Sequence, residues 1–282
     1  VVLWTATQPA LVDLLRSYAP GCPVTELCPQ TAGLYERFRR VCFRQVGTLA
    51  DEALAAQLGG HRQVLCVVNS RKAAQQIFAR LPKEGSYHLS TLMTPAHRQA
   101  LLREIRQRLR DGETCRVVST SLIEAGVDVD FPAAYREQCG LDSLLQTAGR
   151  CNREGRRNAE QSIVHVFEME GGIPRGIMQQ REAAIKTMEK YPEINTRQAI
   201  QAYFKRLLME RGDDMLDQKK IARYMVFSSR LQPVQGKIDR DFTLMCRGGM
   251  MSEEEGWMDT LAEAGAIITH PGCGLCCGRT GG

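Results

Sequence analysis

Apolar and polar positions alternate along the middle of the chain in short blocks that predict a strand, a helix and then another strand. Each predicted strand is a short apolar run rich in β-branched residues, and most are followed by a segment with apolar residues three or four positions apart. The predicted strands cover residues 64–68, 86–90, 115–119, 133–138 and 162–168. The predicted helices cover residues 71–81, 95–110 and 142–152. This alternation indicates an α/β fold with a parallel sheet and crossover helices.

The ends of the chain follow other patterns. A β-branched and aromatic run at residues 1–5 predicts a strand, and the helix after it has Pro9 in its first turn. Prolines and glycines predict a linker over residues 19–33. An edge strand at 38–46 and a helix at 49–58 are expected next. After Gly171 and Gly172 the composition changes, and residues 175–211 have long helical periodicity.

Composition and charge narrow the class of protein. Hydrophobic residues make up 43% of the 282 positions and charged residues 24%, which is ordinary for a globular protein. No apolar run is long enough to cross a bilayer and no secretory signal opens the chain, so we expect a cytoplasmic protein without a membrane partner. The eleven cysteines lack regular spacing and indicate reduced thiols. The net charge of +5 suits phosphate contacts but decides nothing alone.

The segment from Gln146 to Gly155 is the most informative part of the chain. Gln146, Arg150 and Arg153 are spaced i, i+4 and i+7, which on a helix puts one amide and two guanidinium groups on one face. Gly149 between them allows close approach of another backbone or a ligand. Two guanidinium forks and an amide suit a polyphosphate that is gripped at several oxygens.

A second segment, Ser119 to Asp130, directly follows a predicted strand. Thr120 stands at the carboxyl end of that strand, where parallel-sheet domains bind ligands. Gly126 predicts a tight turn, and the Asp128 carboxylate can accept hydrogen bonds from ribose hydroxyls. Alone, these residues could merely form a turn and a cap. Their spacing from the arginine segment favours a binding role.

These two segments, together with Thr5-Ala6-Thr7, resemble motifs III, V and VI of superfamily 2 helicases in order and separation. The segment from Tyr135 to Ser143, which leads into Gln146 to Arg153, resembles the CRISPR-associated helicase–nuclease of type I systems. The subtype I-C branch is the most similar. The resemblance implies a RecA-like fold for the α/β domain and covers residues 1–170 best.

The resemblance also implies roles for individual residues. The residues implied in catalysis are the arginine fingers Arg150 and Arg153 and the nucleotide-contacting Gln146. Those implied in nucleotide binding are Gly126 and Asp128. Those implied in nucleic-acid contact are Thr120, Asn69 and Ser70. Thr5 and Thr7 would couple the nucleotide site to strand separation.

The same resemblance divides the chain into five parts. They are a stub of the first RecA-like domain with motif III (1–20), a linker with edge elements (21–60), the second RecA-like domain with motifs IV to VI (61–172), a mostly helical region (173–264) and a doubtful tail (265–282). A phosphate-cradling loop ending in Gly-Lys-Ser/Thr and an acidic motif II are both absent: Gly236-Lys237 is followed by Ile238, and Asp51 to Leu54 comes after motif III. No His-Asp pair for a nuclease domain occurs.

The expected function is therefore that of a C-terminal fragment of an ATP-dependent DNA helicase of CRISPR type I interference. We expect ATP with Mg²⁺ as its cofactor, with the magnesium ligands in the missing first domain. Single-stranded DNA and the CRISPR surveillance complex are the expected partners. The fragment alone should be inactive. The alternatives are a fragment of another superfamily 2 DNA helicase and a non-enzymatic nucleic-acid-binding module.

Three other features are given structural interpretations. His88 and His97 are interpreted as a strand residue and a helix-start residue. The arginines of residues 95–110 do not all share one face, so we interpret that segment as a solvated crossover helix and not as a nucleic-acid contact. Cys273, Cys276 and Cys277, with His270 upstream, form only half a zinc site, and no metal held by the chain is predicted.

Overall fold

The computed structural model describes residues 33, 35, 37–124, 126–170, 175–216, 225–227 and 231–233. The predictions for the first 32 residues, including Thr5 and Thr7, lie outside the described residues. So do Gly236-Lys237 and the cysteine-rich tail.

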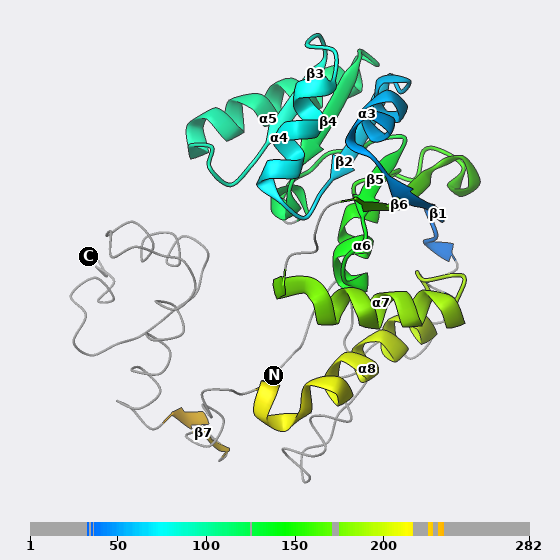
Figure 1. Ribbon diagram of the computed structural model, residues 1–282, viewed down its shortest axis with the longest axis vertical. Coiled ribbons are helices and arrows are strands. Elements are labelled where there is room, and N and C mark those ends of the chain that lie inside the picture. The colour runs from blue at the N-terminus through cyan, green and yellow to red at the C-terminus, as the bar shows by residue number, and fades with distance from the viewer. Residues whose placement is uncertain are drawn as a thin grey trace, which may run out of the picture. The chain divides into compact units, whose positions relative to one another are not determined.

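A six-stranded, wholly parallel sheet forms the centre of the larger compact unit, in the order β1-β6-β5-β2-β4-β3 (Figure 1). The strands are β1 (Cys42–Leu49), β2 (Gln63–Val67), β3 (Ser86–Leu89), β4 (Cys115–Ser119), β5 (Ala134–Glu137) and β6 (Ile163–Met169). The parallel α/β prediction is confirmed. The first strand begins at Cys42, four residues later than predicted, and lies at the sheet edge as expected.

Helices cover both faces of the sheet, and the residues of β2 show how. Leu65 and Val67 belong to one buried cluster together with α5 (Pro95–Arg110), whereas Val64 and Cys66 belong to another with α3 (Asp51–Gly59) and α4 (Arg71–Arg80). Successive residues of a strand point to opposite faces, so a strand that is covered on both sides must be apolar throughout. Fully burying each such side chain contributes about 1.5–3 kcal/mol.

The sequence sets where the crossover helices begin. The Ser70 hydroxyl accepts a hydrogen bond from the backbone N–H of Ala73, and the Thr94 hydroxyl accepts one from His97. Each satisfies a backbone donor that the first turn of a helix leaves free. Pro95 occupies the first position of α5, where its missing N–H costs nothing. The predicted bounds of the helix over residues 95–110 are confirmed.

A third core lies beside the sheet and is built from α6 (Leu141–Ala148), α7 (Met178–Lys190) and α8 (Arg197–Leu216). The fully buried Tyr203 donates a hydrogen bond to the Asp142 carboxylate over 2.8 Å, which ties α8 to the first turn of α6. The helical periodicity predicted over residues 175–211 is confirmed. The domain boundaries drawn from composition stay predictions.

The chain divides into two compact units, residues 1–209 and 210–282. In the second unit, β7 (Met225–Phe227) and β8 (Leu231–Pro233) pair antiparallel. None of the described helices is long and apolar enough to cross a membrane. Four of the described cysteines, Cys66, Cys115, Cys139 and Cys151, are buried thiols. Burial raises the pKa of Cys151 to about 12, so this thiol acts as a small neutral core residue, as expected.

Candidate functional site

The loop after β4 begins with the short 3₁₀ helix η1 (Ser121–Ile123) and carries the predicted Gly126 turn. Gly126 has φ +67°, a conformation that glycine adopts without strain, so the predicted tight turn is confirmed. Thr120 is buried at the carboxyl end of β4. Its hydroxyl has no hydrogen-bond partner within the described residues, although its backbone N–H reaches the Leu89 carbonyl. A buried hydroxyl without a partner is costly and is often completed by a ligand or water.

The prediction that Gln146, Arg150 and Arg153 share one helix face is wrong. Helix α6 ends at Ala148, and only Gln146 lies on it. Beyond Gly149 the chain continues as a turn, in which Asn152 takes a left-handed conformation, with φ +47°. The buried Asn152 side chain stabilises that conformation, since it donates to the Arg40 and Arg157 carbonyls and accepts from the Arg157 N–H.

Backbone hydrogen bonds join the turn after α6 to the loop after β4. The Phe131 N–H donates to the Arg150 carbonyl, and the Asn152 N–H donates to the Phe131 carbonyl, each over 2.9 Å. Phe131 and Cys151 form a parallel bridge and are both buried. Motifs V and VI therefore form one surface, although the two arginines reach it from a turn and not from a helix.

Arg150 is engaged with the motif V loop. Its Nε donates to the Ile123 carbonyl over 3.0 Å and its Nη2 to the Glu124 carbonyl over 2.5 Å. Burial, and then the neighbouring charge of Arg153, lower the pKa of Arg150. A guanidinium nevertheless keeps its charge at any physiological pH. In this state Arg150 positions the loop.

Arg153 is more accessible. Its Nε lies 2.8 Å from Oδ1 of Asp128, and its Nη1 donates to the Gly149 carbonyl over 3.4 Å. The Arg153 side chain is 41% exposed and that of Asp128 is 74% exposed. An exposed ion pair is worth less than about 1 kcal/mol, so either group can exchange its partner for a ligand at little cost.

Gln146 and Gly149, the other two residues singled out in motif VI, have few neighbours. Gln146 is half-buried, and its side chain makes no hydrogen bond within the described part of the chain. The expected close approach of another segment to Gly149 is not found among the described residues. A Cβ added there would meet only the carbonyl oxygens of Leu145 and Gln146.

A buried ionic network connects Asn69, the motif V loop and α6, and sequence reasoning missed it. Arg136 of β5 is 2% exposed, and its Nε lies 3.1 Å from Oε1 of Glu124, within ion-pairing range but out of alignment for a hydrogen bond. Its Nη2 donates to the Ser143 hydroxyl, which in turn donates to Glu124 over 2.7 Å. Burial raises the pKa of Glu124, although Arg136 and Ser143 oppose that rise. The sequence signal that could have revealed the network was Arg136 in the middle of a predicted strand of a sheet covered by helices.

The same network includes Asn69, one of the predicted nucleic-acid residues. The Asn69 carboxamide accepts from Arg136 Nη1 over 2.7 Å and donates to the Gln138 carbonyl over 3.0 Å. Its backbone N–H donates to Glu137. Both ends of the Asn69 side chain are therefore used internally. The neighbouring Ser70 accepts from Ala73 but keeps its own proton available for a ligand oxygen.

Three of the residues predicted for nucleotide contact lie at one surface. Gly126, Asp128 and Arg153 place a glycine turn, a carboxylate and a guanidinium beside one another at the surface. No group of three or more His, Cys, Asp or Glu residues among those described could hold a metal ion. Asp51 and Glu52 lie in the first turn of α3 and pair with Arg80.

Comparison with known proteins agrees with this geometry. The family model described as "CRISPR-associated nuclease/helicase Cas3, C-terminal" matches residues 60–156, the segment that holds β2 to β5, α6 and both motifs. The match covers about a third of the 282 residues and identifies this segment as similar to the C-terminal part of Cas3. The recognised resemblance and the RecA-like α/β fold are thereby confirmed, whereas the subtype I-C assignment stays a prediction.

Two Cas3 relatives show how far the sequence likeness extends. The "CRISPR-associated nuclease/helicase Cas3" of Haloferax volcanii is 42% identical over 79 residues, 27% of this chain and 8% of the relative. That of Methanothermobacter thermautotrophicus is 30% identical over 111 residues, 39% of this chain and 12% of the relative. The chain thus spans about a tenth of the length of these relatives.

A solved structure extends the likeness in fold. The structure titled T. fusca Cas3-AMPPNP is matched with a TM-score of 0.55 at 17% identity, over 79% of this chain and 30% of that one. At this identity the match supports the fold alone. It covers more of the chain than the family model does.

Proposed function

We propose that this chain supplies the second RecA-like domain of an ATP-driven DNA helicase that acts in CRISPR type I interference. The observation that carries the proposal is the exposed Arg153–Asp128 pair beside the Gly126 turn, within the segment that the Cas3 family model matches. In the proposal, the first RecA-like domain presents ATP to this surface. The magnesium ligands belong to that first domain.

Each residue at this surface has one step to perform. Asp128 exchanges Arg153 for ribose hydroxyls, and Arg153 then turns its guanidinium toward the phosphates. Phosphoryl transfer spreads negative charge over the transferring group, and a guanidinium stabilises that charge in the transition state. In GTPases an arginine in this role raises the rate by about 10³–10⁵. Arg150 holds the carbonyls of Ile123 and Glu124, and so keeps the loop in place while it adds positive charge. Gln146 is the remaining side chain proposed to contact the nucleotide.

The DNA side of the proposal rests on the carboxyl edge of the sheet. The buried Thr120 hydroxyl without a partner and the Ser70 hydroxyl are the donors proposed to hold phosphates of a single strand. Asn69 acts through the network it shares with Arg136, as a positioning residue. The CRISPR surveillance complex is the proposed protein partner because the matched family is CRISPR-associated. The proposed location is the cytoplasm.

The test of this proposal is ATP turnover in a reconstituted pair of domains. The chain alone is expected to hydrolyse no ATP. Mixed with the first helicase domain of a Cas3 relative, it should give turnover that single-stranded DNA stimulates. Arg153→Gln should lower kcat by about 10³, as loss of an arginine finger does. The matched control is Arg156→Gln, because Arg156 is exposed and Glu154 is its only ion-pair partner among the described residues. Full turnover by Arg153→Gln would refute the assignment.

A second candidate is a superfamily 2 helicase outside the Cas3 family. The "ATP-dependent helicase Lhr-Core" of Sulfolobus acidocaldarius is 27% identical over 122 residues, which favours this candidate to that extent. The coding DNA upstream of Val1 separates the two. An open frame that carries a phosphate loop and a His-Asp pair supports the Cas3 assignment, and a frame with the loop but without the pair supports the second candidate.

The third possibility from the sequence, a binding module without enzymatic function, makes a different prediction. Its affinity for single-stranded DNA would not change with nucleotide. Binding measured in the reconstituted pair with and without a non-hydrolysable ATP analogue distinguishes it, since a motor domain changes its DNA affinity when the analogue binds.

A further inference from the structure

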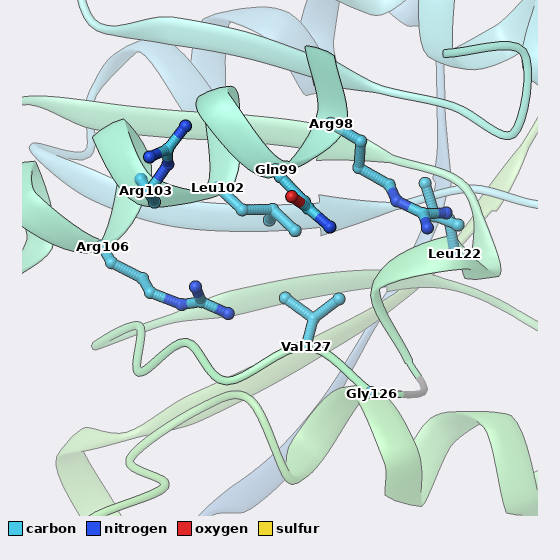
Figure 2. Close-up of a pocket in the computed structure, with 8 residues that line it drawn as sticks. All are labelled: Arg98, Gln99, Leu102, Arg103, Arg106, Leu122, Gly126 and Val127. Atoms are coloured by element: carbon cyan, nitrogen blue, oxygen red, sulfur yellow. The ribbon is translucent and has the colours of Figure 1, made fainter. Parts of the chain in front are cut away.

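The motif V loop faces a hollow of about 550 Å³ on the side of α5. The residues that line this hollow are Arg98, Gln99, Leu102, Arg103, Arg106, Leu122, Gly126 and Val127. In Figure 2 the Arg106 guanidinium extends toward Val127, and Arg103 stands at the rim. Among the described residues, the hydrogen bond from Arg106 Nε to the Asp128 carbonyl is the only one that joins α5 to this loop. The polar contacts that hold the start of the loop come from its other side.

On that other side Glu124 is held by both its side chain and its backbone. Its carboxylate accepts a hydrogen bond from the Ser143 hydroxyl over 2.7 Å, and Oε1 lies 3.1 Å from Nε of Arg136. Its backbone carbonyl accepts from Nη2 of Arg150 over 2.5 Å. The direction of the carbonyl depends on where the carboxylate is tied, because only a few bonds separate the two groups. Arg136 and Glu124, called the buried pair below, therefore influence the position of Arg150.

The buried pair needs an explanation beyond stability. The side chains of Arg136 and Glu124 are 3% and 8% exposed, respectively. The cost of removing two charges from water offsets much of their attraction, so a well-packed apolar pair often stabilises a fold as well or better. An apolar pair cannot, however, supply directional hydrogen bonds to several partners at once.

Arg136 supplies such hydrogen bonds to three different elements. Its Nη1 donates to the Asn69 carboxamide, which follows β2, and its Nη2 donates to Ser143 in the first turn of α6. Its Nε faces Glu124 in the motif V loop. A guanidinium is planar and rigid, so its donors fix the partners relative to one another. The buried pair thereby sets the loop against both the sheet and α6.

The charge of Arg150 is useful to a reaction only in the right place. A displacement of about 1 Å in an active site can cost about 10² in rate. The Arg150 side chain is long and flexible, and the carbonyls of Ile123 and Glu124 are the acceptors that hold it. If the loop shifts, the guanidinium shifts with it.

We propose that Arg136 and Glu124 are positioning residues for ATP turnover. The buried pair fixes the Glu124 carbonyl, and that carbonyl holds the Arg150 guanidinium beside the transferring phosphate. Neither residue of the pair touches the nucleotide. The proposal rests on the proposed function, which supplies the reaction, and adds to it Arg136, a residue outside motifs III, V and VI.

The experiment measures kcat and KM for ATP with the reconstituted domains and single-stranded DNA. The test variant is Glu124→Gln with Arg136→Met, which replaces both charges by neutral side chains of similar length. The matched control is Glu168→Gln with Arg181→Met, because that ion pair joins β6 to α7. Neither double change alters the net charge. Urea unfolding checks that both variants fold.

The test variant should lower kcat at least tenfold and leave KM within twofold, because a displaced Arg150 stabilises the transition state less without changing how ATP binds. The control should keep kcat within twofold of the unaltered chain. Ser143→Ala leaves both charges in place and removes one hydrogen bond to Glu124, so it should lower kcat about threefold. This single variant decides the question if the test variant does not fold.

A third background shows whether the buried pair acts through Arg150. Arg150→Gln should itself lower kcat, and adding the Glu124 and Arg136 changes to it should lower kcat no further. Such non-additivity is expected when residues act through one shared contact.

Four results would overturn the proposal. If the test variant folds and keeps its kcat, or if it does not fold and Ser143→Ala keeps its kcat, the buried pair is only structural and the proposed function stands. If the test variant and the control lower kcat equally, the loss reflects a general weakening of the fold. If the changes at the buried pair and at Arg150 lower kcat additively, the pair does not act through Arg150. If the unaltered chain gives no turnover with the first domain, the proposed function fails together with this proposal.

Discussion

Two sets of arginines surround the same loop, and the protein treats them in opposite ways. Arg136, Arg150 and Arg153 all have partners: a buried carboxylate, two backbone carbonyls and an exposed carboxylate, respectively. Of the α5 arginines that line the hollow beside Gly126 and Val127, Arg98 and Arg103 have no hydrogen-bond or ion-pair partner within the described residues, and Arg106 has only the Asp128 carbonyl. Arg136 and Arg150 are fixed by the fold before any ligand arrives, whereas Arg153 is held by an exposed ion pair that a ligand can replace.

Arginines that have a partner in the fold hold the site in shape, whereas arginines without a partner have donors left to bind a ligand. A guanidinium that already holds a carbonyl or carboxylate contributes to stability, and its geometry is set in advance. A guanidinium without a partner contributes little to stability and repels its neighbours, which a bound anion relieves. The two sets should therefore respond to substitution, pH and added anions in different directions.

The largest difference between the two sets of arginines is expected in the free energy of unfolding after substitution. Arg136→Met removes one partner of a buried ion pair and leaves Glu124 without its counter-charge, which should lower the free energy of unfolding by about 3–5 kcal/mol. The same change at the rim of the hollow, Arg103→Met, should stay within about 0.5 kcal/mol. Urea unfolding measures both. The double variant Glu124→Gln with Arg136→Met should recover part of the loss. A small effect of Arg136→Met alone would show that the network is not coupled.

Arg150 should show an intermediate effect. Arg150→Gln gives up the hydrogen bonds to the Ile123 and Glu124 carbonyls, which at this part-buried position should lower the free energy of unfolding by about 1–3 kcal/mol in total. The loop should also open locally, and hydrogen exchange of the backbone amides of residues 123–127 measures that opening. Arg156→Gln serves as the control, with unchanged exchange in the loop. Protection that is equal in both variants would mean that Arg150 does not hold the loop.

Glu124, the carboxylate partner of Arg136, makes the free energy of unfolding depend on pH, whereas the hollow has no carboxylate that would do so. Burial raises the pKa of Glu124 above its ordinary 4.5, so the folded state binds its proton more tightly than the unfolded state does. The stability from this group is fully present below pH 4.5 and is lost as the pH rises through the raised pKa. The unfolding free energy of the unaltered chain, minus that of the Glu124→Gln and Arg136→Met double variant, should therefore fall from pH 4.5 upward and then level off. A difference that rises with pH would reverse the sign of the argument.

Regular structure in this chain was readable from the sequence because each signal was local. The apolar runs gave the strands of the sheet, and Thr94-Pro95 marked the start of α5. The end of α6 was not readable in the same way. The turn that replaces the predicted last turns of this helix is held by residues distant in sequence: the Phe131 backbone pairs with Arg150 and Asn152, and the Asn152 side chain donates to the Arg40 carbonyl.

The site was predicted by type of residue but not by geometry. The Gly126 turn was recognised, since glycine is the one residue whose backbone preference reveals a turn. The pairing of Arg136 with Glu124 was not recognised, because the two residues meet only once β5 and the motif V loop have folded. The hollow was missed for a related reason: five arginines on one helix were weighed as a group, whereas only Arg98, Arg103 and Arg106 line it.

Stabilisation by inorganic phosphate is the smallest effect expected, and it tests the contrast between the two sets of arginines most directly. Inorganic phosphate should stabilise the chain through the unpartnered arginines, since a ligand that binds only the folded state stabilises it by about 0.4 kcal/mol when its concentration equals its Kd. For a chain of this size that corresponds to roughly 1–2 °C in Tm. Calorimetry in phosphate and in chloride of equal ionic strength measures the difference. The Arg98, Arg103 and Arg106 glutamine variant should lose this increment, whereas Arg153→Gln should keep most of it because Arg153 already has Asp128 as its anion. If Arg153→Gln loses the increment and the hollow variant keeps it, the anion prefers the partnered set and the contrast between the two sets is wrong.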